Sequence, residues 1–171
     1  VSDEIVHEVV SRMSGVKTGI GLDDGGFAAK LGETVKGQPE AVARIARAIA
    51  RANGGLGREG RARCALLFAG PDGCGKRYAA TELARLQGLP VHRLDMSDFQ
   101  EHHTVSRLVG SPPGYVGFGS GGQLTEAVRR TPTCVVLLDR IDLAHPNVAA
   151  VVTHAIETGV LVDSSGRQVS F

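Results

Sequence analysis

The sequence is poor in aromatic residues and carries no strong charge of either sign. Only 4% of its 171 residues are aromatic, and tryptophan is absent. The 19 basic and 18 acidic residues leave a formal net charge of +1. So small a net charge gives no field that would attract a polyanion or an anionic bilayer. We therefore expect neither nucleic acid nor a membrane among the partners.

Cysteine is scarce, and long hydrophobic runs are missing. The three cysteines are odd in number and lack CxxC spacing, which indicates neither a disulfide framework nor a zinc site. The sequence has no run of about 18 apolar residues and no apolar region typical of a signal peptide. With 42% hydrophobic residues, the chain can still bury the core of one domain. These features favour a globular protein of the reducing cytoplasm.

Glycine, in contrast, is abundant, and the most informative motif is rich in it. That motif reads Gly70-Pro71-Asp72-Gly73-Cys74-Gly75-Lys76. The spacing is that of a phosphate-binding loop, in which glycines let backbone N–H groups surround phosphate oxygens and the lysine reaches the outer phosphates. A serine or threonine that binds magnesium normally follows the lysine, but here Arg77 follows. A guanidinium cannot coordinate a cation.

The N-terminal third is predicted to be helical around a linker. A helix is predicted to start near Ser2, where a repeat of apolar residues at helical spacing follows, and to end at Gly15. Residues 19–26 are interpreted as a linker. We place a boundary there, between an N-terminal helix with its linker (1–26) and the main domain (27–171). A second helix is predicted from Pro39 to the stop at Asn53-Gly54.

The remainder shows alternating strand and helix patterns. Apolar runs at 64–69, 91–94 and 134–138 predict strands; the first leads into the glycine-rich loop and the third ends in Asp139. Helices are predicted over 78–86, 104–109 and 123–130. This alternation predicts an α/β fold with a parallel sheet covered on both faces.

Longer motifs point to one family. The most specific are Pro112-Pro113-Gly114-Tyr115-Val116-Gly117-Phe118 and the following Gly121-Gly122-Gln123-Leu124-Thr125-Glu126. With these, the chain resembles the second ATPase module of the Clp-type AAA+ protein unfoldases, and it is ClpA-like. The resemblance implies a three-layer α/β/α P-loop NTPase that binds ATP or ADP. It also implies a ring of AAA+ subunits acting on unfolded protein, with a Clp-type protease as a further partner.

The resemblance assigns roles to individual residues. It implies that residues 70–77 hold the phosphates, that Asp139 helps to hold magnesium, and that Val35 and Lys36 contact adenine. It also implies that Gly114, Tyr115, Val116 and Gly117 form the pore loop that grips the substrate. A tyrosine between glycines suits this role, because an amphipathic ring contacts many sequences and glycines free the backbone.

Three positions depart from the family pattern. Arg77 replaces the hydroxyl ligand, Arg140 replaces the glutamate that activates water, and Lys36 replaces an apolar residue. A general base supplies about 10² to 10⁴ in rate, so we expect hydrolysis to be impaired and a role for Mg²⁺ to be doubtful. We also predict an ion pair between Arg77 and Asp139. Static nucleotide binding, an empty site and an active unfoldase all stay open.

Other features have a plain interpretation beside a functional one. Cys74 is either a redox-sensitive thiol or a small residue, and the stripe of Arg44, Arg47 and Arg51 is either a solvated face or a contact between subunits. Adjacent histidines at 102 and 103 do not face one ligand. The resemblance ends before the strand expected to lie between 64–69 and 134–138, and the helical lid is absent. We expect a fragment with an incomplete sheet, unless segment 64–69 pairs directly with 135–138.

Overall fold

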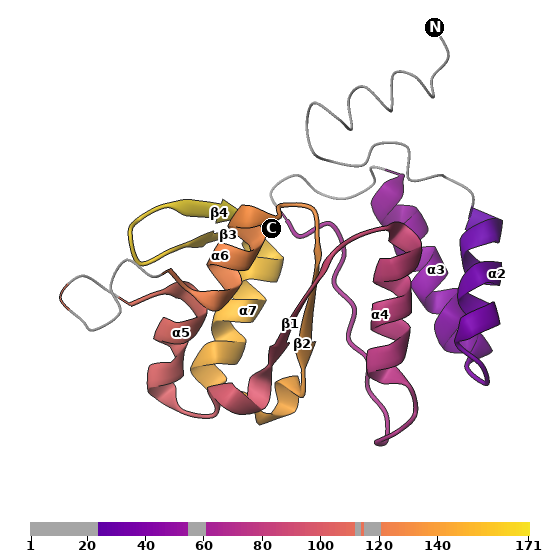
Figure 1. The fold of residues 1–171 in the computed structure, drawn as a ribbon, viewed down its shortest axis with the longest axis horizontal. Helices are drawn as coiled ribbons and strands as arrows, with labels where there is room; N and C mark the ends of the chain where they lie inside the picture. Colours follow the sequence, from indigo (N-terminus) through magenta and orange to yellow (C-terminus); the bar gives the residue numbers. More distant parts are fainter. Residues whose placement is uncertain (1–23, 55–60, 112–113, 115–120) are drawn as a thin grey trace, which may run out of the picture. The chain divides into compact units, whose positions relative to one another are not determined.

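The structure, a computed structural model, describes residues 24–54, 61–111, 114 and 121–171 (Figure 1). Contacts divide them into two compact units. The first contains residues 24–54 and 69–88, and the second contains 61–68 and the described residues from 89 to 171. The helix predicted near the N-terminus and most of the predicted linker lie outside the described residues.

The first unit is a helical group of α2 (Asp24–Thr34), α3 (Pro39–Asn53) and α4 (Lys76–Gln87). Helix α2 packs against both α3 and α4. Leu31 of α2 and Ala84 of α4 are fully buried. Because α2 begins at Asp24, the linker prediction was wrong for residues 24–26. Packing of the apolar side of α2 outweighs the low helix propensity of its two early glycines.

Helix α3 confirms the prediction from the sequence. Pro39 occupies the first turn, where its missing N–H costs nothing, and Val42 and Ile45 are buried on the apolar stripe. The helix ends where the Gly54 N–H donates to the Ala50 carbonyl at 2.9 Å. Helix α4 likewise covers the predicted range and begins two residues earlier.

The second unit is built on two parallel strands, β1 (Val91–Asp95) and β2 (Val135–Asp139). Figure 1 shows them side by side, and the register places Asp95 opposite Asp139. Both strands were predicted. Because the strands are parallel and in this register, the two aspartates end at the same edge of the sheet.

Helices and a hairpin complete this unit. Helices α5 (Val105–Val109) and α6 (Gln123–Arg130) agree with the prediction, whereas α7 (Pro146–Thr158) was not predicted. Three short 3-10 helices are η1 (Met96–Phe99), η2 (His102–Thr104) and η3 (Ile141–Leu143). Strands β3 (Val160–Val162) and β4 (Gln168–Ser170) form an antiparallel hairpin. The apolar core includes Met96, Phe99, Leu108, Leu124, Val148 and Val169.

The strand predicted over 64–69 is not formed, and this prediction was wrong. Leu66 and Leu67 are 41% and 80% exposed. A run of apolar residues supplies side chains for a buried strand, but a strand also needs a neighbour with which to share backbone hydrogen bonds. In the described residues β2 pairs with β1, so the direct pairing of 64–69 with 135–138 is not formed either.

The unpredicted helix α7 carries signals that were available in the sequence. Pro146 lies in its first turn, Gly159 follows its end in a left-handed conformation, and Val148, Val152 and Ala155 are buried at helical spacing.

Within the part of the chain that the structure describes, no helix has the length and apolar character needed to cross a membrane.

Candidate functional site

The glycine-rich loop turns directly into helix α4. Gly73 and Gly75 have φ angles of 77° and 91°, a region that residues with a Cβ rarely adopt. Gly75 is the N-cap of α4, and Lys76 is its first residue. The unpaired N–H groups and the positive end of the helix dipole at this terminus favour an anion. Phosphate binding by this loop stays a prediction.

The Lys76 ammonium is directed back over its own loop. It donates hydrogen bonds to the carbonyl oxygens of Gly70 and Pro71, both at 2.7 Å, and lies 3.9 Å from the Cys74 Sγ. These three contacts match the three donors of a lysine. The positive charge is therefore held at the loop, where a phosphate would have to compete with two carbonyl oxygens for its protons.

An apolar cavity lies between α2 and α3 in the same unit. It has a volume of about 440 Å³ and is lined in part by Ala28, Gly32, Val35, Lys36, Pro39 and Val42. Val35 is buried, whereas Lys36 is exposed. The cavity is wide open to solvent rather than enclosed. Val35 and Lys36, the two neighbouring residues predicted to contact adenine, both line this cavity.

Two ion pairs cross between the ends of β1 and β2. Arg93 on β1 donates to Asp139 on β2, with 2.7 Å between Nη2 and Oδ2. In the opposite direction, Arg140 binds both oxygens of Asp95, and its Nε lies 3.1 Å from Oδ1. We call Arg93, Asp95, Asp139 and Arg140 the strand-end quartet. Its two positive and two negative charges balance.

Ser97 extends the quartet on the side of Asp95. Its Oγ donates to Asp95 Oδ1 at 2.7 Å and accepts a hydrogen bond from Arg140 Nη2 at 2.9 Å. The Arg140 guanidinium and the Ser97 hydrogen bonds hold the pKa of Asp95 well below its usual range, and Asp95 in turn raises the pKa of Arg140. Asp95 is therefore an anion whose acceptors are already engaged.

The backbone of Arg140 is also unusual. With a φ of 57°, it is the one non-glycine residue with a positive φ among the described residues. Side chains disfavour this conformation, which persists where surrounding contacts hold it. The bidentate contact with Asp95 is such a contact.

The side chains at the ends of β1 and β2 fit a magnesium ion poorly. Magnesium requires carboxylate or neutral oxygen ligands in a near-octahedral shell, and guanidinium groups occupy oxygens of both strand-end carboxylates. Among the described residues, no group of three or more His, Cys, Asp or Glu side chains is placed to hold a metal ion.

The pore-loop motif lies largely outside the described residues. Gly114 is described, with a φ of 89°, but the predicted contact residues Tyr115, Val116 and Gly117 are not. The chain on either side of this segment is closely packed. A Cβ on Gly122 would lie 2.2 Å from the Leu108 carbonyl oxygen, so only glycine fits there.

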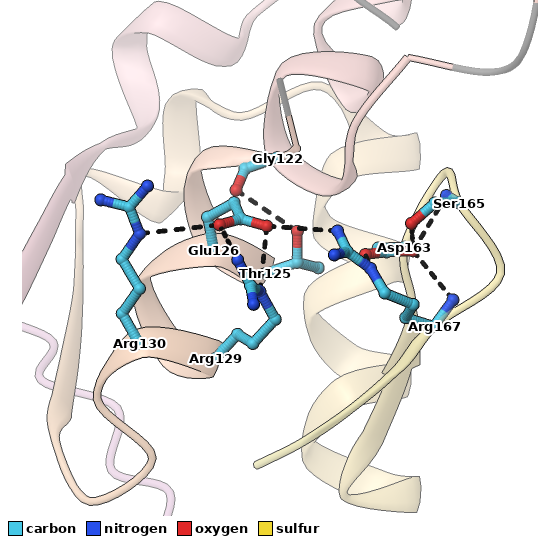
Figure 2. A network of polar contacts seen from close by, with 8 residues as sticks. All are labelled: Gly122, Thr125, Glu126, Arg129, Arg130, Asp163, Ser165 and Arg167. Carbon is cyan, nitrogen blue, oxygen red and sulfur yellow. Dashed lines mark hydrogen bonds and ion pairs between the residues drawn. The ribbon is translucent and has the colours of Figure 1, made fainter. Parts of the chain in front are cut away.

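A network of charged side chains joins α6 to the β3–β4 hairpin (Figure 2). Figure 2 shows the Glu126 carboxylate of α6 between Arg129, Arg130 and Arg167, with Nη2 of Arg129 at 2.7 Å and that of Arg167 at 3.3 Å. Arg167 Nε also donates to the buried Asp163 at 2.7 Å. The turn of the β3–β4 hairpin is thereby joined to α6.

The predicted site residues fall in two units. Residues 70–77 and the cavity belong to the first, and Asp139 belongs to the second. The ion pair between Arg77 and Asp139 therefore stays a prediction. The sequence did not lead us to predict a role for Arg93, Asp95 and Ser97 at this site. A signal was present, because the apolar pattern at 91–95 ends in an aspartate, as the run at 135–139 does.

Comparison with known proteins identifies relatives of the whole chain. Residues 61–171 match the family described as AAA domain (Cdc48 subfamily). The chain is 45% identical over its full length to "Chaperone protein ClpC1, chloroplastic" of Arabidopsis thaliana, and covers 19% of it. It is 44% identical to "Probable chaperone protein ClpB 1" of Chlorobaculum tepidum, with 97% of the chain and 40% of that protein aligned.

A third relative carries a more specific name. "ATP-dependent Clp protease ATP-binding subunit ClpA homolog CD4B, chloroplastic" of Solanum lycopersicum is 45% identical over the full chain, which covers 19% of it. The chain thus spans about a fifth of the length of these chloroplastic relatives.

Proposed function

Because this chain belongs to the AAA family, as a Clp-type module with a partial α/β P-loop NTPase fold, we propose that it binds ATP or ADP and hydrolyses ATP poorly. The observation that carries the proposal is the loop of the first unit. Its backbone turns at Gly73 and Gly75 into the start of α4, and Lys76 lies over it. Together they provide N–H donors and a positive charge for phosphate.

The cavity between α2 and α3 supports the same proposal. Its apolar lining, which includes Val35 and Pro39, suits a flat apolar base. Lys36 lines this cavity as well and places a basic side chain at its surface. The proposed ligand is thus a nucleotide whose base lies in the cavity and whose phosphates lie at residues 70–76.

Poor hydrolysis follows from the side chain at position 140. A general base must accept a proton, and the Arg140 guanidinium remains protonated and is bound to Asp95. Loss of such a base costs about 10² to 10⁴ in rate. Arg77 occupies the position of the hydroxyl that normally binds the metal, which lowers the rate further.

The wider function proposed is that of a protein-unfoldase module. It would act in a ring with other AAA+ subunits and contact unfolded protein through residues 114–117, with a Clp-type protease as a further partner. The support is the resemblance of the pore-loop motif and the names of the relatives, one of which is a subunit of a Clp protease. Cytoplasmic localisation is part of the proposal, although several relatives are named as chloroplastic.

A second candidate is an interaction subunit that has lost nucleotide altogether. The observation that favours it is the hydrogen bonding of Lys76 to Gly70 and Pro71, which satisfies the ammonium without a phosphate.

Calorimetric titration with ATP distinguishes these candidates. The proposal predicts measurable heat and a raised melting temperature at saturating ATP, because a ligand that binds only the folded chain stabilises it. Absence of both heat and thermal stabilisation contradicts nucleotide binding and leaves the interaction subunit.

Turnover tests the second half of the proposal. Wild-type hydrolysis of ATP should lie close to the background, and the combined change Arg77→Thr with Arg140→Glu should raise it. Arg47→Glu is a suitable control, because it changes an arginine on α3 that belongs to neither the loop nor the strand ends. Turnover by the wild type equal to that of the double variant would show that Arg140 does not impair hydrolysis.

A further inference from the structure

We infer that the strand-end quartet takes the place of a divalent metal ion at the carboxyl ends of β1 and β2, and that Arg140 is the residue that keeps such an ion out. The quartet lies wholly within the second unit, so the inference goes beyond the proposed nucleotide binding and does not depend on it.

The geometry links the two strands in both directions. Asp95 and Asp139 are paired in the register of β1 and β2, so their carboxylates end at the same edge. Arg93, two residues before Asp95, reaches across to Asp139, and Arg140, immediately after Asp139, reaches back to Asp95. Each strand therefore supplies the cation for the carboxylate of the other.

The carboxylates of the quartet are more sheltered than its guanidinium groups. The side chains of Asp95 and Asp139 are 27% and 15% exposed, whereas those of Arg140 and Arg93 are 50% and 46% exposed. Arg140 contacts both oxygens of Asp95 and also Ser97, and this bidentate geometry holds a guanidinium more firmly than a single contact does.

The charge balance works against a divalent cation. A metal at this edge would have to displace a guanidinium from Asp95 or Asp139 and leave that arginine beside it. Replacement of Arg140 by glutamate reverses the situation, because it adds a third carboxylate and frees Asp95. Three converging carboxylates are a suitable ligand set for Mg²⁺ or Mn²⁺.

The direct test is binding of Mn²⁺ to the whole chain, measured by electron paramagnetic resonance, in which bound Mn²⁺ loses the sharp signal of the free ion. Three proteins are compared: the wild type, Arg140→Glu, and the control Arg44→Glu. The control makes the same change of charge on α3, at an arginine paired with Glu40 at 2.6 Å. We expect Arg140→Glu to bind Mn²⁺ about ten-fold or more tightly than the other two.

Equal affinity of the wild type and Arg140→Glu for Mn²⁺ overturns the inference, as does an equal gain in the control. If circular dichroism shows that Arg140→Glu does not fold, Arg140→Gln serves as the second variant. It removes the charge without adding a carboxylate beside Asp95, and it should still bind Mn²⁺ more tightly than the wild type does.

Discussion

The segment that leads into the glycine-rich loop offers a sharp test, because sequence and structure differ there. The perturbation is Leu67→Ala, compared with Leu108→Ala. Leu67 is 80% exposed and Leu108 is fully buried, and both belong to the second unit. The two changes remove the same atoms, so the difference between them reports the folded environment.

The magnitudes follow from burial. Complete burial of a leucine side chain stabilises by about 1.5–3 kcal/mol, and Leu67 retains only about a fifth of that burial, so its truncation should cost no more than roughly 0.6 kcal/mol. Leu108 should cost about 2–5 kcal/mol, because truncation also leaves a cavity.

Urea unfolding followed by far-UV circular dichroism measures both free energies of unfolding. The free energies are compared for the unfolding transition of the second unit, because two units need not unfold together. A cost for Leu67→Ala as large as that for Leu108→Ala would refute the reasoning, since it would mean that residues 64–69 are buried in solution as the apolar run predicts.

Three further predictions concern the cavity, the hairpin and the pore loop. Gly32→Ala should raise the free energy of unfolding by about 0.5–1 kcal/mol, because the new Cβ would have Val42, at 4.0 Å, as its nearest neighbour. Gly122→Ala should lower the free energy of unfolding, because its Cβ would clash with the backbone of Leu108. Melting temperatures that change in the opposite directions would contradict this. Burial raises the pKa of Asp163, but hydrogen bonds outweigh burial and hold it below the usual range. Its stabilisation is then complete above about pH 5 and falls as the pH drops below about 4, so Asp163→Asn should lose less stability than the wild type between pH 7 and pH 3.5 in urea unfolding. Tyr115→Ala should weaken binding of a fluorescent unfolded protein about ten-fold in an anisotropy assay, and Tyr115→Phe should not; equal binding by all three proteins would contradict the pore-loop assignment.

The sequence predicted the elements whose signals are local. Helix α3 has its proline at the start, its apolar stripe and its glycine stop within 16 residues, and the structure confirms it. Strand β2 is an apolar run that ends in aspartate, and it too is confirmed. The family was identified from motifs of this local kind.

Features that depend on partners far away in the sequence were not predicted. The run at 64–69 has the composition of a strand, but only the fold decides whether a neighbouring strand is present. The pairing of Arg140 with Asp95 joins residues 45 positions apart. It follows from the parallel register of two strands, which no local pattern specifies.

The central claim is that the ends of β1 and β2 carry a balanced group of four charges in place of a metal site. The most direct measurement is the affinity for Mn²⁺ of the wild-type chain and of Arg140→Glu, followed by electron paramagnetic resonance. Tighter binding by Arg140→Glu alone is the predicted result, because Arg93 and Arg140 balance Asp139 and Asp95 in the wild type. Equal affinity of the two proteins would contradict the claim.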